Sequence, residues 1–344
     1  MNEDIRISQP YRMAYAEGVR KVVEKRRAKA DAARQAYASP EKVAANPEQY
    51  REALRRMLGW PLTEASRPMP KVTICEEKMI APGILMQRVQ IETLPDLPFY
   101  GLLLIPQNRK EKMPLVISQH GGWGTPEQTA NIHQPNKYKS MTLRPAQAGC
   151  VVFAPQLLLW LEAEEMEGRV AYGLAHHRGQ REHELRQLGG SIVALEVHSI
   201  MNAIDWLSTL PEVDGSRIGM MGISYGGFYT QMTAAVDTRI KAAVSNAFFN
   251  ERYRYCWHDF SWFDSAYQML DAEICALIAP RAFCIHVGTE DKVFDYEGAV
   301  QEFERLKPFF EAQNASAQLR FILSDVNHTL TDSGEEMEFL MNHL

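Results

Sequence analysis

A serine set among glycines is the residue of this sequence whose surroundings first indicate chemistry. Ser224 lies in "RIGMMGISYGGF", residues 217–228, between a short apolar run and a segment with helical character. A strand that turns sharply into a helix would hold the Ser224 hydroxyl above the edge of a sheet, and the nearby glycines would permit such a turn. An alcohol is almost wholly protonated at neutral pH, so a nucleophilic serine needs a base, and the base needs an orienting acid. The alternative is a glycine-rich turn in which the serine only caps a helix.

Two later segments supply an acid and a base in a suitable order. "RAFCIHVGTEDKVF" contains a buried strand followed by Asp291, and "LRFILSDVNHTL" contains the next strand followed by His328. The order Ser224, Asp291, His328, with each residue after a strand, predicts a Ser-His-Asp triad. We favour Asp291 because the loop directly after a strand best orients an imidazole that reaches from the next loop. Three other acids compete for this role: Glu290, Asp295 and Asp325.

An acyl-transfer site also needs donors that stabilise the oxyanion. "PLVISQHGGWGTP" ends a strand and opens into a glycine-rich loop, so a backbone N–H there can point toward the nucleophile. We expect the N–H of Gly122 or Trp123 to act with the N–H of Tyr225, the residue after the serine.

Four motifs in this order, "HGGWG", "GISYGG", "GTED" and "NH", resemble the α/β-hydrolase superfamily. The resemblance is to its acetyl xylan esterase, dienelactone hydrolase and prolyl-oligopeptidase-like branches, and it covers about residues 70–344. It implies that Ser224, Asp291 and His328 form the catalytic triad. The chain lacks room for the large propeller domain of prolyl oligopeptidases, so the resemblance favours an esterase over a peptidase.

The elements that must position these residues alternate along the chain. Short buried apolar runs recur after Pro70, with helix-compatible segments between most of them. This alternation predicts an α/β-hydrolase fold, with a mostly parallel central sheet, helices on both faces and an antiparallel edge from the first strands. Helical patterns over 11–37 and 46–62 predict an N-terminal helical extension, residues 1–70, ahead of a catalytic domain, residues 71–344.

Two segments are expected near the mouth of the site. The polar stretch 171–191 lies between a strand and a helix. The aromatic segment 248–272 follows a strand and is a possible lid or pocket insertion, although its rings could equally be core. We expect Trp257, Trp262 and Phe263 to present apolar surface to the substrate, next to charged side chains that could contact its polar part.

The composition argues against several other classes of protein. The chain has 344 residues, of which 46% are hydrophobic, and a net charge of −6, which disfavours a nucleic-acid partner. Its five cysteines are scattered without Cys-x-x-Cys spacing, which is typical of a reducing compartment. Without a signal-like start or a membrane-length apolar run, we expect a cytoplasmic protein with no membrane partner. Because "HELRQ" at 183–187 departs from His-Glu-x-x-His and no phosphate loop is present, we expect neither a metal nor a cofactor.

These observations together predict a serine esterase for short-chain acyl esters, with a small-molecule ester as its substrate. Two alternatives stay open, a prolyl-oligopeptidase-like peptidase and a non-catalytic binding protein that keeps the scaffold. A homo-oligomer is also possible.

Overall fold

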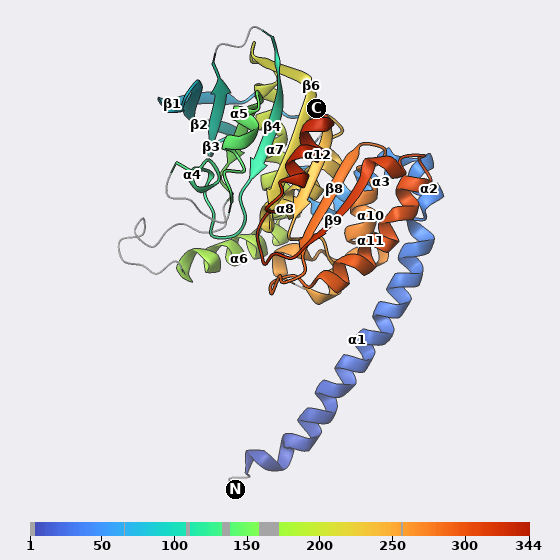
Figure 1. The fold of residues 1–344 in the computed structure, drawn as a ribbon. Coiled ribbons are helices and arrows are strands. Elements are labelled where there is room, and N and C mark those ends of the chain that lie inside the picture. Colours follow the sequence, from blue (N-terminus) through green and yellow to red (C-terminus); the bar gives the residue numbers. More distant parts are fainter. Residues whose placement is uncertain (1–3, 65, 108–110, 133–137, 158–171, 256) are drawn as a thin grey trace.

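The structure is a computed structural model that describes residues 4–64, 66–107, 111–132, 138–157, 172–255 and 257–344. Within these residues the strands form a nine-stranded sheet in the order β1-β2-β3-β5-β4-β6-β7-β8-β9 (Figure 1). The strands are β1 (Lys71–Ala81), β2 (Ile84–Leu94), β3 (Leu97–Pro106), β4 (Met113–Gln119), β5 (Val151–Pro155), β6 (Val213–Ile223), β7 (Ile240–Asn246), β8 (Ala282–Gly288) and β9 (Leu319–Ser324).

The sheet has an antiparallel end and a parallel body. β1, β2 and β3 form an antiparallel meander, and β3 pairs antiparallel with β5. From β5 onward every neighbouring pair, through β4, β6, β7, β8 and β9, is parallel. The antiparallel edge and the parallel sheet predicted from the apolar runs are therefore confirmed. Parallel strands end at a common edge, so the loops after β6, β8 and β9 meet at one side of the sheet.

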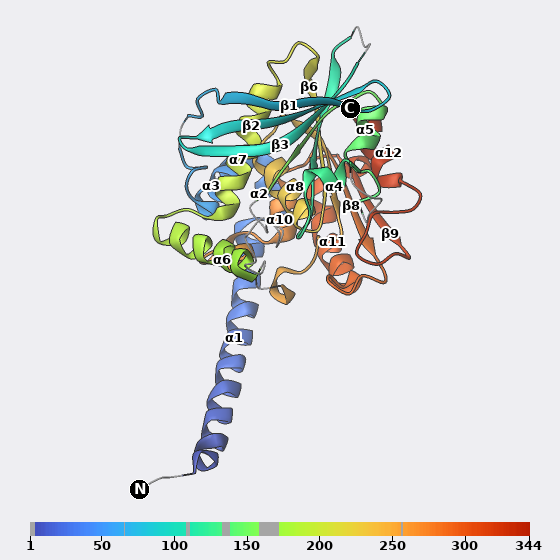
Figure 2. The same cartoon turned by 90° about the vertical axis from the view of Figure 1, so that its left-hand side faces the viewer.

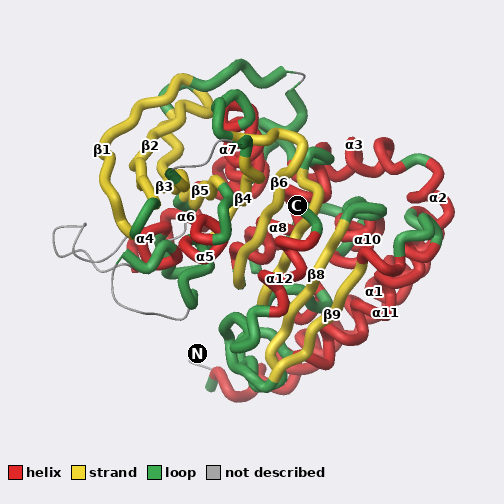
Figure 3. The backbone as a smooth tube through the Cα atoms, turned by 45° about the horizontal axis from the view of Figure 1, so that its top comes forward, coloured by secondary structure: helices red, strands yellow, loops and turns green. Residues whose placement is uncertain are grey.

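Helices cover both faces of this sheet (Figure 3). One face buries a large apolar cluster with α3 (Pro47–Leu58), α7 (Ile192–Leu207), α8 (Tyr225–Val236) and α10 (Asp271–Ala276). The other face buries a smaller cluster beneath α5 (Leu143–Gln147) and α12 (Glu335–Asn342). Between the two helical layers, β5 and β8 are buried along their whole length, as their continuous apolar runs predict. The helices after β4 are α4 (Pro126–Thr129), α5 (Leu143–Gln147), α6 (Tyr172–Gln187), α7 (Ile192–Leu207), α8 (Tyr225–Val236), α9 (Ser265–Gln268), α10 (Asp271–Ala276), α11 (Tyr296–Glu311) and α12 (Glu335–Asn342).

Three helices precede the sheet: α1 (Gln9–Tyr37), α2 (Pro40–Ala45) and α3 (Pro47–Leu58). The two predicted N-terminal helices are confirmed, and α2 is an additional short helix that begins at Pro40 after its capping residue Ser39. Leu54 and Leu58 of α3 are fully buried in the same apolar cluster as the helices α7 and α8. The boundary expected at residue 70 from the sequence thus lies between helices and a sheet that share one apolar core.

Aromatic residues between β7 and α10 form irregular structure with two short turns of 3-10 helix, η3 (Arg252–Arg254) and η4 (His258–Phe260), followed by α9. Two further 3-10 turns are η1 (Ile5–Ser8) and η5 (Ser316–Gln318). Among the residues described, no helix has the length and apolar character that a membrane span requires.

Candidate active site

Ser224 occupies the turn between β6 and α8, and the predicted strand–turn–helix is confirmed. Its backbone has φ 58° and ψ −124°, a region that non-glycine residues rarely adopt. The Ser224 N–H donates to the carbonyl of Asn246 at 2.8 Å, and the Asn246 side-chain amide donates to the carbonyl of Gly222 at 3.0 Å. The end of β7 therefore holds the strained turn from both sides.

Two glycines allow the turn to lie close to the neighbouring strand. A side chain on Gly226 would overlap the backbone carbonyl of Gln119 at the end of β4, and one on Gly222 would overlap the backbone of Gly226. Gly121 also lies close to the turn, because a Cβ there would lie 3.0 Å from the Cβ of Ser224. The loop after β4 thus runs directly beside the serine.

Asp291 and His328 contact each other across neighbouring loops. The Oδ2 atom of Asp291 lies 2.8 Å from Nδ1 of His328. The other oxygen, Oδ1, accepts the N–H groups of Val293 at 2.7 Å and Phe294 at 3.2 Å. A carboxylate only accepts hydrogen bonds, so this contact places the proton of a neutral imidazole on Nδ1 and leaves the lone pair on Nε2.

Burial differs between these two side chains in a way that suits their expected roles. The Asp291 side chain is 1% exposed, and that of His328 is 20% exposed. The ring of Phe294 lies 5.9 Å from the imidazole, centre to centre. Asp291 is thereby fixed by backbone donors and shielded from water, whereas the imidazole keeps access to the surface.

The three competing acids have other contacts. Asp295 caps α11 by accepting the N–H of Gly298 at 2.7 Å, and it also accepts the hydroxyl of Tyr255 at 2.9 Å. Asp325 accepts the hydroxyl of Thr289 at 2.9 Å, and Glu290 is exposed. Of the four acids, Asp291 is the one for which the structure gives a hydrogen bond to His328.

The loop expected to supply oxyanion donors forms a tight turn after β4. Gly124 N–H donates to the carbonyl of Gly121 at 3.1 Å, and Trp123 between them has φ 60°. The buried His120 fixes the start of this loop, since its Nε2 accepts the N–H of Leu157 at 3.0 Å. Gly122 and the exposed Trp123 lie in this turn, and Tyr225 is the first residue of α8. Their assignment as donors stays a prediction.

A buried ionic network beneath Tyr225 was not foreseen from the sequence. The Tyr225 hydroxyl donates to Asp259 at 3.2 Å, and Arg178 of α6 donates to the same carboxylate at 2.9 Å. Arg178 also pairs with Glu196 of α7 at 3.2 Å and donates to the hydroxyl of Tyr229 at 2.8 Å. Burial, together with the charge of Asp259, raises the pKa of Tyr225 above its ordinary value.

The polar stretch that was expected to line the mouth of the site falls on α6, with part of it outside the described residues. Arg178, which opens the part whose side chains are described, is 3% exposed and faces the interior. The network joins four elements, α6, α7, α8 and η4, through charged groups that are separated by 18 or 81 positions in the chain. No local sequence motif indicates ion pairs between residues so far apart in the chain, so these contacts could not be predicted from the sequence.

The three predicted substrate aromatics lie in two places. Trp257 stacks on Tyr225 with ring centres 5.9 Å apart, so it lies next to the residue that follows Ser224. Trp262 is buried and stacks against Phe228, and it contributes with Phe263 to a pocket of about 550 Å³ beside α1 and α3. Neither Ser224 nor His328 lines that pocket. Only Trp257 is thus brought toward the serine, and its contact with substrate stays a prediction.

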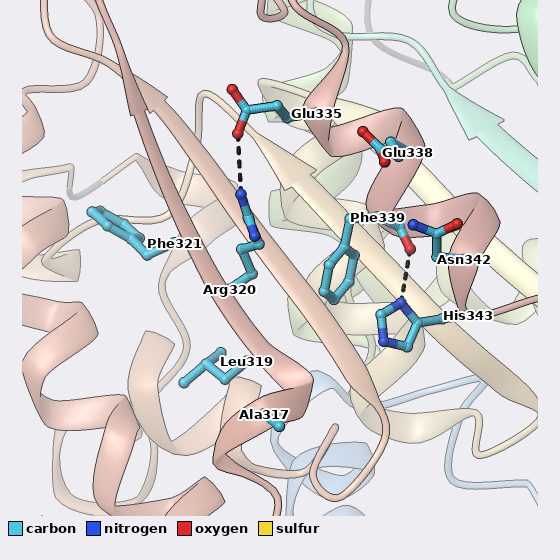
Figure 4. Close-up of a pocket in the computed structure, with 9 residues that line it drawn as sticks. All are labelled: Ala317, Leu319, Arg320, Phe321, Glu335, Glu338, Phe339, Asn342 and His343. Atoms are coloured by element: carbon cyan, nitrogen blue, oxygen red, sulfur yellow. Dashed lines mark hydrogen bonds and ion pairs between the residues drawn. The ribbon is translucent and has the colours of Figure 1, made fainter.

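A second surface pocket lies between the edge strand β9 and α12 (Figure 4). There Arg320 pairs with Glu335 at 3.1 Å, and Nδ1 of His343 contacts the carbonyl of Phe339 at 2.8 Å. None of the predicted triad residues lines this pocket. In the described part of the chain, no group of three or more His, Cys, Asp or Glu side chains is placed to hold a metal ion.

Comparison with known proteins connects this arrangement to a fold class. A family model described as X-Pro dipeptidyl-peptidase (S15 family) matches residues 180–311, which include Ser224 and Asp291. "Putative hydrolase YtaP" of Bacillus subtilis is 27% identical over 187 residues, which is 50% of this chain and 62% of YtaP. The chain thus spans less than two thirds of the length of the curated relatives it matches.

Solved structures resemble most of the chain. A "putative acetyl xylan esterase" from Bacteroides fragilis has a TM-score of 0.68 at 17% identity, covering 83% of this chain and 76% of its own. A glucuronoyl esterase from Solibacter usitatus has a TM-score of 0.60 at 19% identity, covering 86% of this chain and 90% of its own. At these identities the likeness establishes the fold alone. The protein has the α/β-hydrolase fold, as its motifs predicted.

Proposed function

We propose that the protein is a serine hydrolase that cleaves carboxylic esters, with Ser224 as nucleophile, His328 as base and Asp291 as orienting acid. The observation that carries the proposal is the 2.8 Å hydrogen bond between Asp291 and His328. It joins the loops after β8 and β9 at the edge of the sheet where Ser224 follows β6. A strained serine turn and an acid-bound imidazole at one edge are the parts that acyl transfer requires.

The chemistry follows from the proton positions. Nε2 of His328 accepts the proton of Ser224 as Oγ attacks the ester carbonyl carbon, and backbone N–H groups stabilise the oxyanion. The imidazolium, stabilised by Asp291, then protonates the leaving alcohol as the C–O bond breaks. Water attacks the resulting acyl-enzyme by the same proton route and releases the carboxylic acid. We assign the oxyanion donors to Tyr225 and to Gly122 or Trp123.

Short-chain acyl esters with a polar alcohol are the substrates that we propose. Two of the structural relatives are named as a putative acetyl xylan esterase and a glucuronoyl esterase. Trp257, stacked on Tyr225, offers one broad aromatic surface near the serine. A long acyl chain would need a continuous apolar tunnel, and Trp262 and Phe263 lie in a different pocket.

A peptidase is the second candidate, and the match to the S15 family model favours it. That match covers residues 180–311 and stops before His328. It therefore supports the serine and the acid of a hydrolase without defining the group that the enzyme cleaves. A non-catalytic binding protein is the third candidate, and it would have no need of an acid-bound imidazole at the serine edge.

A substrate panel separates the three candidates. Rates would be measured for p-nitrophenyl acetate, butyrate and octanoate and for a glycyl-prolyl p-nitroanilide, with Ser224→Ala as the matched control. We expect clear hydrolysis of acetate, a steep fall with acyl length and little amide cleavage. The Ser224→Ala variant should lose at least about 10³-fold in rate, since only binding and the oxyanion site would remain. Amide cleavage as fast as acetate cleavage would favour the peptidase, and an unchanged rate in Ser224→Ala would refute the serine mechanism.

A further inference from the structure

The buried ionic network joins Tyr225, the residue after the proposed nucleophile, to three other elements. Its members are Arg178 of α6, Glu196 of α7, Tyr225 and Tyr229 of α8, and Asp259 of η4. Figure 2 shows α6 at the edge of the body, below α7. Arg178 nevertheless faces inward and is buried. The network thus connects an outer helix with the first turn of α8, directly after Ser224.

This network places charged groups where water does not reach. Among the described residues, two carboxylates, Asp259 and Glu196, contact the guanidinium of Arg178, and all three side chains are buried. Burial of charged groups has a desolvation cost, and well-packed apolar side chains in their place often give equal or greater stability. Stability alone therefore does not explain why charged groups lie here.

What the network does provide is a fixed orientation of the Tyr225 side chain. The Tyr225 hydroxyl donates to Oδ2 of Asp259 at 3.2 Å. The ring stacks on Trp257 and lies 4.9 Å from the ring of Phe260, centre to centre. The guanidinium of Arg178 lies 5.5 Å from the centre of the same ring. Tyr225 is therefore held both at its hydroxyl and over its ring.

Asp259 is itself held by Arg178. Nε of Arg178 donates to the same Oδ2 atom at 2.9 Å, so one oxygen accepts both the guanidinium and the tyrosine hydroxyl. Arg178 also pairs with Glu196 at 3.2 Å and donates to the hydroxyl of Tyr229 at 2.8 Å. Hydrogen bonds to an ionised acceptor are stronger than those between neutral groups. The Tyr225 hydroxyl is thus bound to a carboxylate whose own position is fixed from α6.

The side chain of Tyr225 and its backbone N–H share one Cα atom. Tyr225 is the first residue of α8, and the first N–H groups of a helix point out of its start. A side chain that is held at its tip therefore restricts rotation of the peptide group between Ser224 and Tyr225. Oxyanion stabilisation requires donors that are aimed before the charge develops, and a misplacement of about 1 Å can cost about 10²-fold in rate.

We propose that Asp259 is a positioning residue, which holds the Tyr225 hydroxyl and thereby aims the N–H of Tyr225 at the oxyanion. Arg178 keeps Asp259 in place from α6. The inference rests on the proposed function, because it concerns an oxyanion donor of that mechanism. It extends the mechanism by making the strength of this donor depend on a buried carboxylate outside the triad.

Removal of the Tyr225 hydroxyl tests this dependence. Tyr225→Phe keeps the ring and removes the hydrogen bond to Asp259. We expect its turnover number for p-nitrophenyl acetate to fall by about 10-fold or more. KM should change by less than about 2-fold, because the oxyanion forms only in the transition state.

Tyr229→Phe is the matched control. Tyr229 is a buried tyrosine of the same helix whose hydroxyl also contacts the network, one turn further from Ser224. Its loss should change the turnover number and KM by less than about 2-fold. Equal losses of turnover in the two variants would overturn the inference, since they would show a general effect of the network on the fold.

A transition-state analogue and a conservative variant separate positioning from loss of structure. Ser224 Oγ adds to the carbonyl carbon of 1,1,1-trifluoropentan-2-one, its proton passes to His328, and the ketone oxygen becomes an oxyanion. The inhibition constant should rise in Tyr225→Phe by the same factor as the turnover number falls. Asp259→Ala should be as slow as Tyr225→Phe. Asp259→Asn should recover most of that loss, since an amide oxygen in the place of Oδ2 accepts both donors.

The outcomes also distinguish this inference from the proposed function. A wild type that hydrolyses esters, with an unchanged turnover number in Tyr225→Phe, would refute the positioning role and leave the esterase intact. The same conclusion would follow if Asp259→Asn were as slow as Asp259→Ala. A wild type that neither hydrolyses an ester nor binds the ketone would refute the proposed function and the inference with it. Circular dichroism checks that each variant is folded, and Tyr225→Phe with Asp259→Asn suffices if Asp259→Ala is not.

Discussion

At the scale of single residues, the proposed mechanism depends on which acid orients His328. Asp291 presents Oδ2 to the imidazole and is held by two backbone N–H groups, whereas Asp325 is exposed and accepts the hydroxyl of Thr289. Replacing the carboxylate of Asp291 by an amide would allow the wrong imidazole tautomer, in which Nε2 carries the proton.

We therefore expect Asp291→Asn to lower the turnover number for p-nitrophenyl acetate by about 10⁴-fold. Asp325→Asn is the matched control, and it should change turnover less than about 10-fold because its partner is a threonine hydroxyl. Steady-state kinetics on both variants measure the difference. A larger loss in Asp325→Asn would move the acid to the loop that holds His328 itself.

The order of the three residues that we propose as a triad could be predicted because each has a signal in its neighbouring sequence. Ser224, Asp291 and His328 each follow a recognisable apolar run, and parallel strands bring such loops to one edge. Their distances could not be predicted. The places of Trp262 and Phe263 were also beyond the sequence, because an aromatic cluster does not indicate which rings face the core and which face another pocket.

At the scale of elements, the turn between β6 and α8 depends on backbone contact with β4. A methyl group on Gly226 would overlap the Gln119 carbonyl, so the helix start would have to shift. We expect Gly226→Ala to lose about 2–3 kcal/mol in the free energy of unfolding and most of the activity.

Gly18→Ala in α1 is the control for this prediction. Nothing lies within 4 Å of a Cβ there, and better helix propensity should stabilise α1 locally by about 1 kcal/mol. Chemical denaturation should show no loss of stability in the control, and equal losses in the two variants would contradict the close approach.

The contact between α10 and α11 should make stability depend on pH. Burial raises the pKa of Glu302 to about 8, and the nearby carboxylates of Asp271 and Glu273 add to the effect. The folded state therefore binds this proton more tightly than the unfolded chain, in which the pKa is 4.5. The stabilising contribution is fully present below pH 4.5 and is lost as pH rises toward 8.

Glu302→Gln keeps an oxygen for the N–H of Ala272, which Glu302 accepts at 2.9 Å, and removes the ionisation. We expect this variant to be more stable than the wild type by about 1–3 kcal/mol at pH 8–9. The difference should shrink as pH falls toward 5. Urea denaturation at a series of pH values measures it, and a constant difference across the series would contradict the raised pKa.

At the scale of the whole molecule, the alternation of apolar runs was enough to predict the layers but not the contacts that join them. The sheet and its two helical faces follow from short-range periodicity. Arg178, Glu196 and Asp259 meet only after α6, α7 and η4 have packed, so their pairing is a property of the folded chain. The projection of α1 away from the sheet (Figure 1) could not be predicted either, since helix propensity indicates a helix without indicating what it packs against.

The buried network should contribute to stability through Arg178. Its removal leaves Asp259, which is fully buried, and Glu196, which is nearly so, without their cation. We expect Arg178→Met to lose about 3–5 kcal/mol in the free energy of unfolding. Arg181→Met removes an exposed pair with Glu184 and should lose less than about 1 kcal/mol. Equal values from guanidinium denaturation of the two variants would show that the buried charges do not depend on Arg178.

The proposed mechanism requires Ser224 to be a nucleophile that His328 activates. A fluorophosphonate reacts with such a serine by forming a phosphorus–oxygen bond and releasing fluoride, and peptide mass spectrometry locates the adduct. We expect one adduct per chain, on the peptide that contains Ser224. The adduct should be absent in Ser224→Ala and should form at least about 10²-fold more slowly in His328→Ala. An unlabelled wild type, or a label on any other residue, would contradict it.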